Sequence, residues 1–436
     1  MLDNSRPTPQ HRLAGVLLLV MIVASVLSGF GLSDFLWVSG FSALSALVLL
    51  WSRNRRAQRI QCFVFVAIGF TCLAFAWSHG YDGFPIKQML TQNHLLISLL
   101  SAVSFLRLIT DTRGTGRQIP RTGKKAFLQT LTGVHFFSSV INLSALIIFG
   151  DALAKKQKLD RTTATSLQRG FSLAALWSPF FAAMGTCLLY APGTKLPDLW
   201  LLSMPLCFFG LAITWTEYRF SQSGRMDTFE GYPVNFRALL VPSLMVVCIL
   251  AANSLFPDVS VLVLVSALSL IVTALVATFR ESFFQAIRTV RNFSCTRLPD
   301  MYAELGLFFS TGVMATGISV LVAKTQPTLD AVGFTAGIAI ALLAILLLLA
   351  VAGVHAIVSI VAASAIVMPL NPEPAVLAFI FLVTWSVGAT GGPISGLNLA
   401  MQSRYGVGML QCFTWNLRYT IGMFLGASAI ILVALG

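Results

Sequence analysis

The sequence predicts an all-α polytopic membrane protein built from two inverted-topology repeats. Of its 436 residues, 56% are hydrophobic and only 10% are charged, whereas a soluble domain is about 25% charged. Mean hydropathy is +0.82, and apolar runs long enough to cross a bilayer follow one another along the chain. These runs predict roughly ten to twelve crossings plus re-entrant pieces.

The second observation is a pair of short landmarks that recurs in the same order. Gly-Val-His occurs at 133–135 and at 353–355, and each copy is followed by Trp-Ser, at 177–178 and at 385–386. Duplication of a membrane chain is typical of secondary transporters, in which the site lies where the repeats meet. The landmarks therefore predict a transporter rather than a receptor or an enzyme.

The longest polar stretch divides the chain into halves of similar size. It runs from Glu217 to Arg237 and predicts a cytoplasmic linker. The organisation that we expect is a first repeat at 1–216, the linker at 217–237 and a second repeat at 238–436. Each repeat would hold scaffold helices, then a hairpin and a broken helix, with the hairpins at 127–150 and 332–370 and the broken helices at 164–190 and 376–402.

Charge gives the orientation. Basic residues gather in alternate loops, for example at 53–59, 113–125, 155–161 and 280–297. The positive-inside rule places these loops and the N-terminus in the cytoplasm, so the protein is expected in a bacterial inner membrane. Contact with anionic lipid headgroups accounts for the net charge of +13, and no nucleic-acid motif is present. Residues 281–297 place apolar residues close to one helical face and arginines around the other. This pattern predicts an interfacial helix on the inner leaflet or, alternatively, a partner-binding helix.

Both flanks of residues 127–150 are basic, with Lys124-Lys125 before and Lys155-Lys156 after. The apolar stretch between them is about one span long. A hairpin that enters and leaves on the cytoplasmic side satisfies both flanks, whereas a simple crossing, the alternative, would leave one basic loop outside.

The segment Gly388 to Asn398 packs glycines and a proline into a stretch expected at membrane depth. Backbone released from helical bonding there must face protein or a water-filled cavity, where carbonyls and half-helix ends can hold an ion or a carboxylate. The alternative is a glycine-rich packing face between helices. The candidate substrate-binding residues are Thr390, Gly391, Gly392, Pro393, Ser395 and Asn398, together with Ser138, Ser139, Asn142 and Ser178 of the first half.

Coupling can be expected from two sets of residues. Neutral oxygens suit sodium, and Ser139, Asn142, Thr390 and Asn398 are its candidate ligands. His135 and His355 are candidates for proton coupling, because imidazole titrates near neutral pH; the alternative is a packed, hydrogen-bonded role. Arg107, Arg169 and Arg418 lie in or beside apolar runs, where they either snorkel to the inner headgroups or attract anions. Seven scattered cysteines form no CxxC pair, so no zinc site, disulfide framework or other cofactor is expected.

Two inverted halves, each with a hairpin and a broken helix, resemble the ion transporter superfamily of secondary carriers, which includes the dicarboxylate and citrate carriers and the large membrane subunits of tripartite carriers. Gly353-Val354-His355 resembles a Gly-x-His lead-in of those subunits, and Gly391 to Asn398 stands where the family has its second substrate and sodium loop. The Ser-Asn-Thr signature of the dicarboxylate carriers is absent from both halves. The resemblance implies an elevator mechanism, with a transport domain sliding against a scaffold that forms a homodimer.

The function expected from the sequence is symport of a small organic anion, with carboxylates as the leading class, coupled to sodium or protons. The alternatives are an exporter of drugs or inorganic anions, and a flippase or enzyme acting on a lipid-linked substrate. The outward loops are short and no acidic residues cluster there. We therefore assign no catalytic residue and expect no enzyme activity.

The hairpin makes a labelling prediction. If residues 127–150 re-enter, the loops on both sides of them are cytoplasmic. Single cysteines introduced as Arg121→Cys and Lys158→Cys should then resist an impermeant thiol reagent added from outside the cell. Labelling of either position from outside would show that this stretch crosses the membrane.

Overall fold

The structure is a computed structural model that describes residues 8–109, 122–155, 158–221, 229–232, 240–325 and 333–436. Throughout these ranges the secondary structure is helical and forms no β-strand; a single antiparallel bridge joins Thr122 and Glu230. Nine helical segments within the same ranges are long and apolar enough to cross a membrane. The predicted class, an all-α polytopic membrane protein, is confirmed.

The chain forms two compact units, and each takes one segment from each half of the sequence. Unit 1 comprises residues 1–110 and 244–328, and unit 2 comprises residues 111–243 and 329–436. The two units are described separately.

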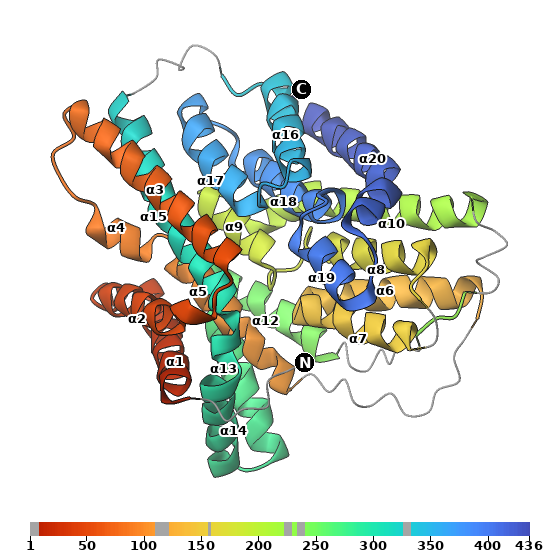
Figure 1. Cartoon of the computed structure of the whole chain (residues 1–436), viewed down its shortest axis with the longest axis horizontal. Coiled ribbons are helices and arrows are strands. Elements are labelled where there is room, and N and C mark those ends of the chain that lie inside the picture. The colour runs from red at the N-terminus through yellow and green to blue at the C-terminus, as the bar shows by residue number, and fades with distance from the viewer. Residues whose placement is uncertain (1–7, 110–121, 156–157, 222–228, 233–239, 326–332) are drawn as a thin grey trace. The chain divides into compact units, whose positions relative to one another are not determined.

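Unit 1 is a bundle in which helices far apart in sequence lie side by side. In Figure 1 the orange α3 runs along the teal α15, and α1 packs on α2. α13 contacts both α5 and α14. Its helices are α1 (Pro9–Gly29), α2 (Phe35–Leu50), α3 (Arg56–Ser78), α4 (Ile86–Thr91), α5 (His94–Ser104), α13 (Val261–Arg280), α14 (Phe283–Thr296), α15 (Tyr302–Thr325) and, from residue 244 on, α12 (Leu240–Leu255).

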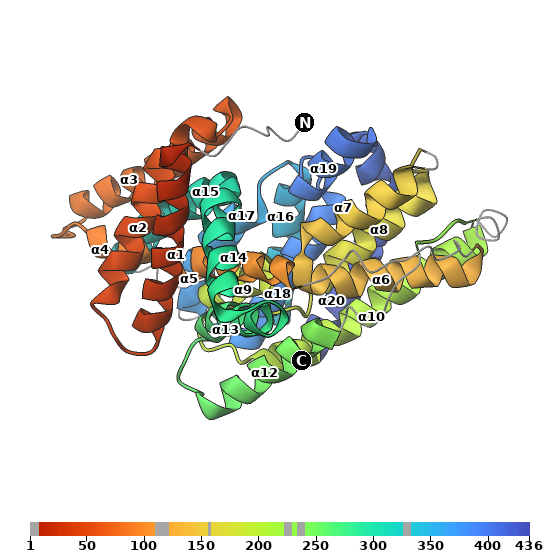
Figure 2. The same cartoon turned by 90° about the horizontal axis from the view of Figure 1, so that it is seen from below.

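Unit 2 surrounds one central helix, α18, which is buried along almost its whole length and packs against α8, α9, α10, α16 and α20. Figure 2 shows α6, α7 and α8 side by side. The helices of unit 2 are α6 (Lys124–Ile141), α7 (Leu143–Ala154), α8 (Arg161–Ala174), α9 (Ala182–Tyr190), α10 (Leu196–Ser221), α16 (Ala336–Val351), α17 (Ala356–Val367), α18 (Pro374–Gly391), α19 (Gly396–Tyr405) and α20 (Met409–Leu435).

The linker predicted at 217–237 begins inside a helix, because α10 continues to Ser221. Residues 222–228 and 233–237 of that linker lie outside the described residues. Because this part of the linker is helical, Glu217 faces the interior of unit 2 from the last turns of α10 and pairs there with Arg169.

The surface is apolar, as a bilayer requires. Phe279 is 87% exposed, Leu201 75% and Val433 86%, although such side chains are usually buried in water-soluble proteins. Inside, serine and threonine hydroxyls donate to carbonyls of their own helix, as Thr316 does to Gly312 and Ser266 to Leu262. These two buried hydroxyls thereby gain a partner without water.

Two glycines permit the close contact between α3 and α15. A β-carbon at Gly317 would lie 2.1 Å from the carbonyl oxygen of Gly69, and one at Gly69 would lie 2.7 Å from the carbonyl oxygen of Val313. Both obstacles are backbone atoms, which cannot rotate away. Small residues therefore set the distance between these helices, as in other membrane bundles.

Gly317→Ala is accordingly expected to lower the stability of the protein in detergent by about 1–3 kcal/mol, the usual cost of overpacking. Gly333→Ala is the matched control, because nothing lies within 4 Å of its β-carbon position. The measurement is the melting temperature of each purified variant. Equal melting temperatures for the two variants would contradict this account of the α3–α15 contact.

Candidate functional site

The turn between α6 and α7 is a single residue, Asn142, with φ +50° and ψ −134°. Residues other than glycine rarely adopt this backbone conformation. The Asn142 amide donates from Nδ2 to the carbonyl oxygen of Phe180 at 3.2 Å. The tip of the α6–α7 hairpin therefore contacts the segment that separates the next two helices, α8 and α9.

That segment, residues 175–181, separates α8 from α9 and contains Trp177, Ser178 and Pro179. Pro179 has no backbone N–H to continue the helix. The Ser178 hydroxyl donates to the carbonyl oxygen of Ser139 and accepts from the backbone N–H of Phe180 at 3.2 Å. The first break and the first helical hairpin thus hold each other through backbone carbonyls.

In the second half the corresponding turn lies between α16 and α17, at residues 352–355. Gly353 has φ +92°, which only glycine adopts readily. His355 caps α17: its Nδ1 accepts from the backbone N–H of Ile357 at 3.3 Å. A β-carbon on Gly353 would lie 3.0 Å from Cδ1 of Ile394, so this tip also contacts a break.

The second break, residues 392–395, separates α18 from α19. A β-carbon on Gly392 would lie 2.7 Å from the carbonyl oxygens of both Ala350 and Gly388, so the end of α16 packs directly on the backbone of this break. Ser395 starts α19 by accepting from the N–H of Asn398, and its hydroxyl donates to the carbonyl oxygen of Ala389.

Each histidine of the repeated tripeptide packs on the tryptophan of its own half. The ring centroids of His135 and Trp177 are 5.9 Å apart, and those of His355 and Trp385 are 5.4 Å apart. The backbone settings differ, because His135 lies inside α6 whereas His355 lies at the start of α17. The repeated tripeptide therefore places a histidine ring against a tryptophan ring in both halves, once from within a helix and once from a helix start.

His135 has a hydrogen-bond partner on each ring nitrogen. Nδ1 lies 3.2 Å from the carbonyl oxygen of Gly170, which can only accept, and Nε2 lies 3.0 Å from Nε1–H of Trp177, which can only donate. The ring is therefore neutral with its proton on Nδ1. Protonation of Nε2 would require the Trp177 bond to break.

A chain of buried amides starts at the second break. Nδ2 of Asn398 donates to the carbonyl oxygens of Gly392 at 2.9 Å and Thr390 at 3.3 Å. Oδ1 of Asn398 accepts from Nε2 of Gln168 at 2.6 Å, and Oε1 of Gln168 accepts from Nδ2 of Asn416 at 3.0 Å. Oδ1 of Asn416 accepts from Nε of Arg169 at 2.8 Å.

The two ends of this chain fix the direction of every amide. A guanidinium can only donate, so Asn416 turns its oxygen to Arg169, and backbone carbonyls can only accept, so Asn398 turns its nitrogen to Gly392. Gln168 then fits in one orientation only. All donors point from Arg169 towards the break, an arrangement in which hydrogen bonds strengthen one another.

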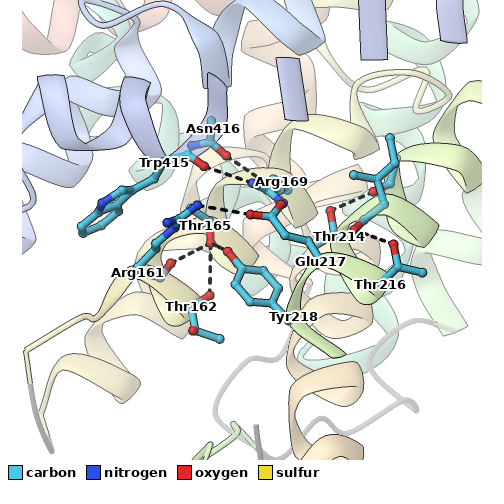
Figure 3. Close-up of polar contacts among 12 residues, drawn as sticks. Arg161, Thr162, Thr165, Arg169, Thr214, Thr216, Glu217, Tyr218, Trp415 and Asn416 are labelled. Atoms are coloured by element: carbon cyan, nitrogen blue, oxygen red, sulfur yellow. Dashed lines mark hydrogen bonds and ion pairs between the residues drawn. The ribbon is translucent and has the colours of Figure 1, made fainter. Parts of the chain in front are cut away.

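Arg169 itself is fully buried, and each nitrogen of its guanidinium has a hydrogen-bond partner (Figure 3). NH1 donates to Oε2 of Glu217 at 2.7 Å, and NH2 donates to the carbonyl oxygen of Trp415 at 3.3 Å. The ring of Tyr419 lies 4.5 Å from Cζ, within cation–π range. Arg161, 36% exposed, shares the same carboxylate at 3.3 Å.

The structure separates the predicted site residues into two groups within unit 2. Ser139, Asn142 and Ser178 meet at the first tip and break, while Thr390, Gly391, Gly392, Pro393, Ser395 and Asn398 form the second break. Ser138 is buried, and its hydroxyl has no hydrogen-bond partner among the described residues. No hydrogen bond between the two groups is seen in the described ranges.

The four predicted sodium ligands already have partners. The hydroxyls of Ser139 and Thr390 donate within their own helices, to Phe136 and Val387. Oδ1 of Asn398 accepts from Gln168, whereas Asn142 uses only its Nδ2. Within the described parts of the chain, no three His, Cys, Asp or Glu side chains come together as a metal site.

Sequence reasoning missed Gln168, Asn416 and Glu217 and treated Arg169 as a snorkelling or mouth residue. Snorkelling is wrong for Arg169, whose side chain is 0% exposed. The one local signal was an arginine next to a glutamine within α8, whose other buried residues are small, hydroxylic or leucine. Such a pair is costly at membrane depth unless it has partners, and this predicts a network without naming its members.

Comparisons with known proteins leave the family open. No family model matches the chain, and no curated protein matches it in sequence. The crystal structure of the Alcanivorax borkumensis YdaH transporter, described as having an unusual topology, aligns over 85% of this chain and 97% of that chain, with a TM-score of 0.49 and 13% identity. A likeness of this size establishes no shared activity.

The buried pair should matter far more to stability than an exposed one. Arg169→Met leaves Glu217 with only the partly exposed Arg161, leaves two other acceptors without their donor, and is expected to cost about 3–5 kcal/mol. Asp151→Asn removes the charge and one of the two acceptor oxygens that Arg404 bonds at 2.7 and 2.5 Å. The side chains of Arg404 and Asp151 are 49% and 39% exposed, so the loss should be about 0–1 kcal/mol.

Denaturant unfolding of the purified variants in detergent measures both effects. The double variant Arg169→Met/Glu217→Leu should regain part of the loss, because it removes both charges together. Similar losses for Arg169→Met and Asp151→Asn would show that Arg169 does not organise unit 2.

Proposed function

We propose that the protein is a secondary active transporter of a small organic anion, with carboxylates as the first class to test. One observation carries this proposal: the tip of a helical hairpin contacts a helix break, once in each half of the chain, at Asn142–Phe180 and at Gly353–Ile394. Broken helices within an apolar protein are retained where their backbone lines a polar cavity.

The charge of the substrate is inferred from the helix ends. α7 and α9 begin at the first tip and break, and α17 and α19 begin at the second. The N-terminus of a helix carries a partial positive charge and unpaired N–H groups, which suit a carboxylate. The C-terminal ends of α8 and α18 lie at the same breaks, and their carbonyls suit a cation.

The coupling ion follows from the same groups. Sodium would be held by break carbonyls with the oxygens of Ser139, Asn142, Thr390 and Asn398, once Asn398 turns from Gln168. Proton coupling would use His355, because His135 is bonded at both nitrogens. We favour sodium, since it requires no buried imidazolium.

The division of the chain suggests how transport proceeds. Unit 2 contains both hairpins and both breaks, so we propose that it is the moving domain of an elevator. Unit 1 would then be the scaffold and would form a homodimer. The N-terminus is proposed to be cytoplasmic and the membrane to be the bacterial inner membrane, on the charge pattern of the loops.

Gly392→Leu is expected to abolish transport, because its side chain would collide with the carbonyl oxygens of Ala350 and Gly388 at the second break. Gly408→Leu is the matched control, since the nearest atom to its β-carbon position is a flexible side-chain atom, Oε1 of Gln411 at 3.4 Å. Counterflow of organic acids in proteoliposomes should fall to background for Gly392→Leu and stay within about twofold of wild type for Gly408→Leu.

The substrates for this assay come from a thermal-shift screen of purified protein against organic acids, with and without sodium. Sodium should raise the melting temperature further in the presence of the substrate. Normal counterflow by folded Gly392→Leu would move the site away from this break. Uptake driven equally well by a pH gradient without sodium would instead support His355.

A further inference from the structure

We propose that unit 1 binds an anionic phospholipid, with one acyl chain in a groove between α1, α13 and α14 and its phosphate on arginines of α14. This site is separate from the proposed transport site and independent of it. The groove has a volume of about 280 Å³, and its lining includes Val16, Thr278, Phe283, Arg291, Ser294 and Cys295.

The wall of the groove calls for an apolar ligand. Its two hydroxyls are already bonded within their helices, Thr278 to Ala274 at 2.8 Å and Ser294 to Val290 at 2.9 Å. Apart from Arg291 and Cys295, what remains towards the groove is aliphatic and aromatic surface. A cavity of this size is at the small end of ligand pockets and suits part of an acyl chain rather than a whole bulky molecule.

The edge of the groove carries positive charge. Arg291 is a lining residue, and Arg288 lies one helical turn before it; both side chains are exposed, and neither has an ion-pair partner among the described residues. The nearby carboxylate of Glu281 accepts from Thr289 at 3.1 Å. Guanidinium groups bind phosphate with paired, charge-assisted hydrogen bonds.

The side chains of α14 suit a helix at the membrane interface. Phe283 and Phe284 of α14 are 61% and 83% exposed, and Phe279 near the end of α13 is 87% exposed. Both arginines lie on α14. A helix with exposed aromatic residues and basic residues is typical of the membrane interface. There, an acyl chain in the groove and a phosphate on Arg288 and Arg291 belong to one molecule.

The test uses native mass spectrometry of the full-length protein with phosphatidylglycerol or phosphatidylcholine of identical acyl chains. Wild type should retain more phosphatidylglycerol than phosphatidylcholine. In Arg288→Gln/Arg291→Gln the ratio of the two retained lipids should fall by on the order of fivefold for each arginine removed. The control Arg55→Gln/Arg56→Gln removes two exposed charges elsewhere in unit 1 and should keep it. Equal retention of the two lipids by wild type would overturn the proposal.

A second variant tests the groove itself. Val16 lines it and is 45% exposed, so Val16→Trp can fill the groove without overpacking the core. It should reduce retention of both lipids at least fivefold while the protein stays monodisperse. Displacement of the lipid by inorganic phosphate alone would indicate a site for free anions. A change of oligomeric state in Val16→Trp would indicate that a second copy of the chain occupies the groove. Either result contradicts lipid binding.

Discussion

The buried guanidinium of Arg169 is the constraint on which unit 2 depends. A charge without water is tolerated only when it is paired and hydrogen-bonded. The partners of Arg169 come from α10, through Glu217, and from α20, through Asn416 and Trp415. The same requirement extends through Asn416 and Gln168 to the second break. The geometry of a glycine-rich break is thus fixed by a cation on another helix.

Much of the fold could be predicted because it follows from local composition. Apolar runs and few charges specify membrane helices, and the predicted all-α class is confirmed. Pro179 and Gly392 prevent continuous helices for reasons contained in the residues themselves. The end of α10 could not be placed, because Glu217 and Arg219 read as the start of a polar linker, whereas Glu217 bonds to buried Arg169, 48 positions away in the chain.

The candidate site could be predicted only in part. The residues of the second break were identified by their backbone chemistry. Gln168 and Asn416 were missed because their contacts join residues 230 and 248 positions apart, for which a single sequence holds no signal. Asn142 was identified for its oxygen, but the structure assigns it the turn, at φ +50°, and a bond to Phe180. The role of a polar side chain depends on the partner that the fold supplies.

The central claim is that the amide chain from Arg169 holds the second break in place, and hydrogen exchange of residues 388–399 tests it most directly. Gln168→Leu removes the middle link at nearly constant volume and leaves the Arg169–Glu217 pair intact. The account predicts faster amide exchange at 388–399 in this variant, with exchange in α3 and α15 unchanged. Unchanged protection of residues 388–399 in a folded Gln168→Leu protein would contradict it.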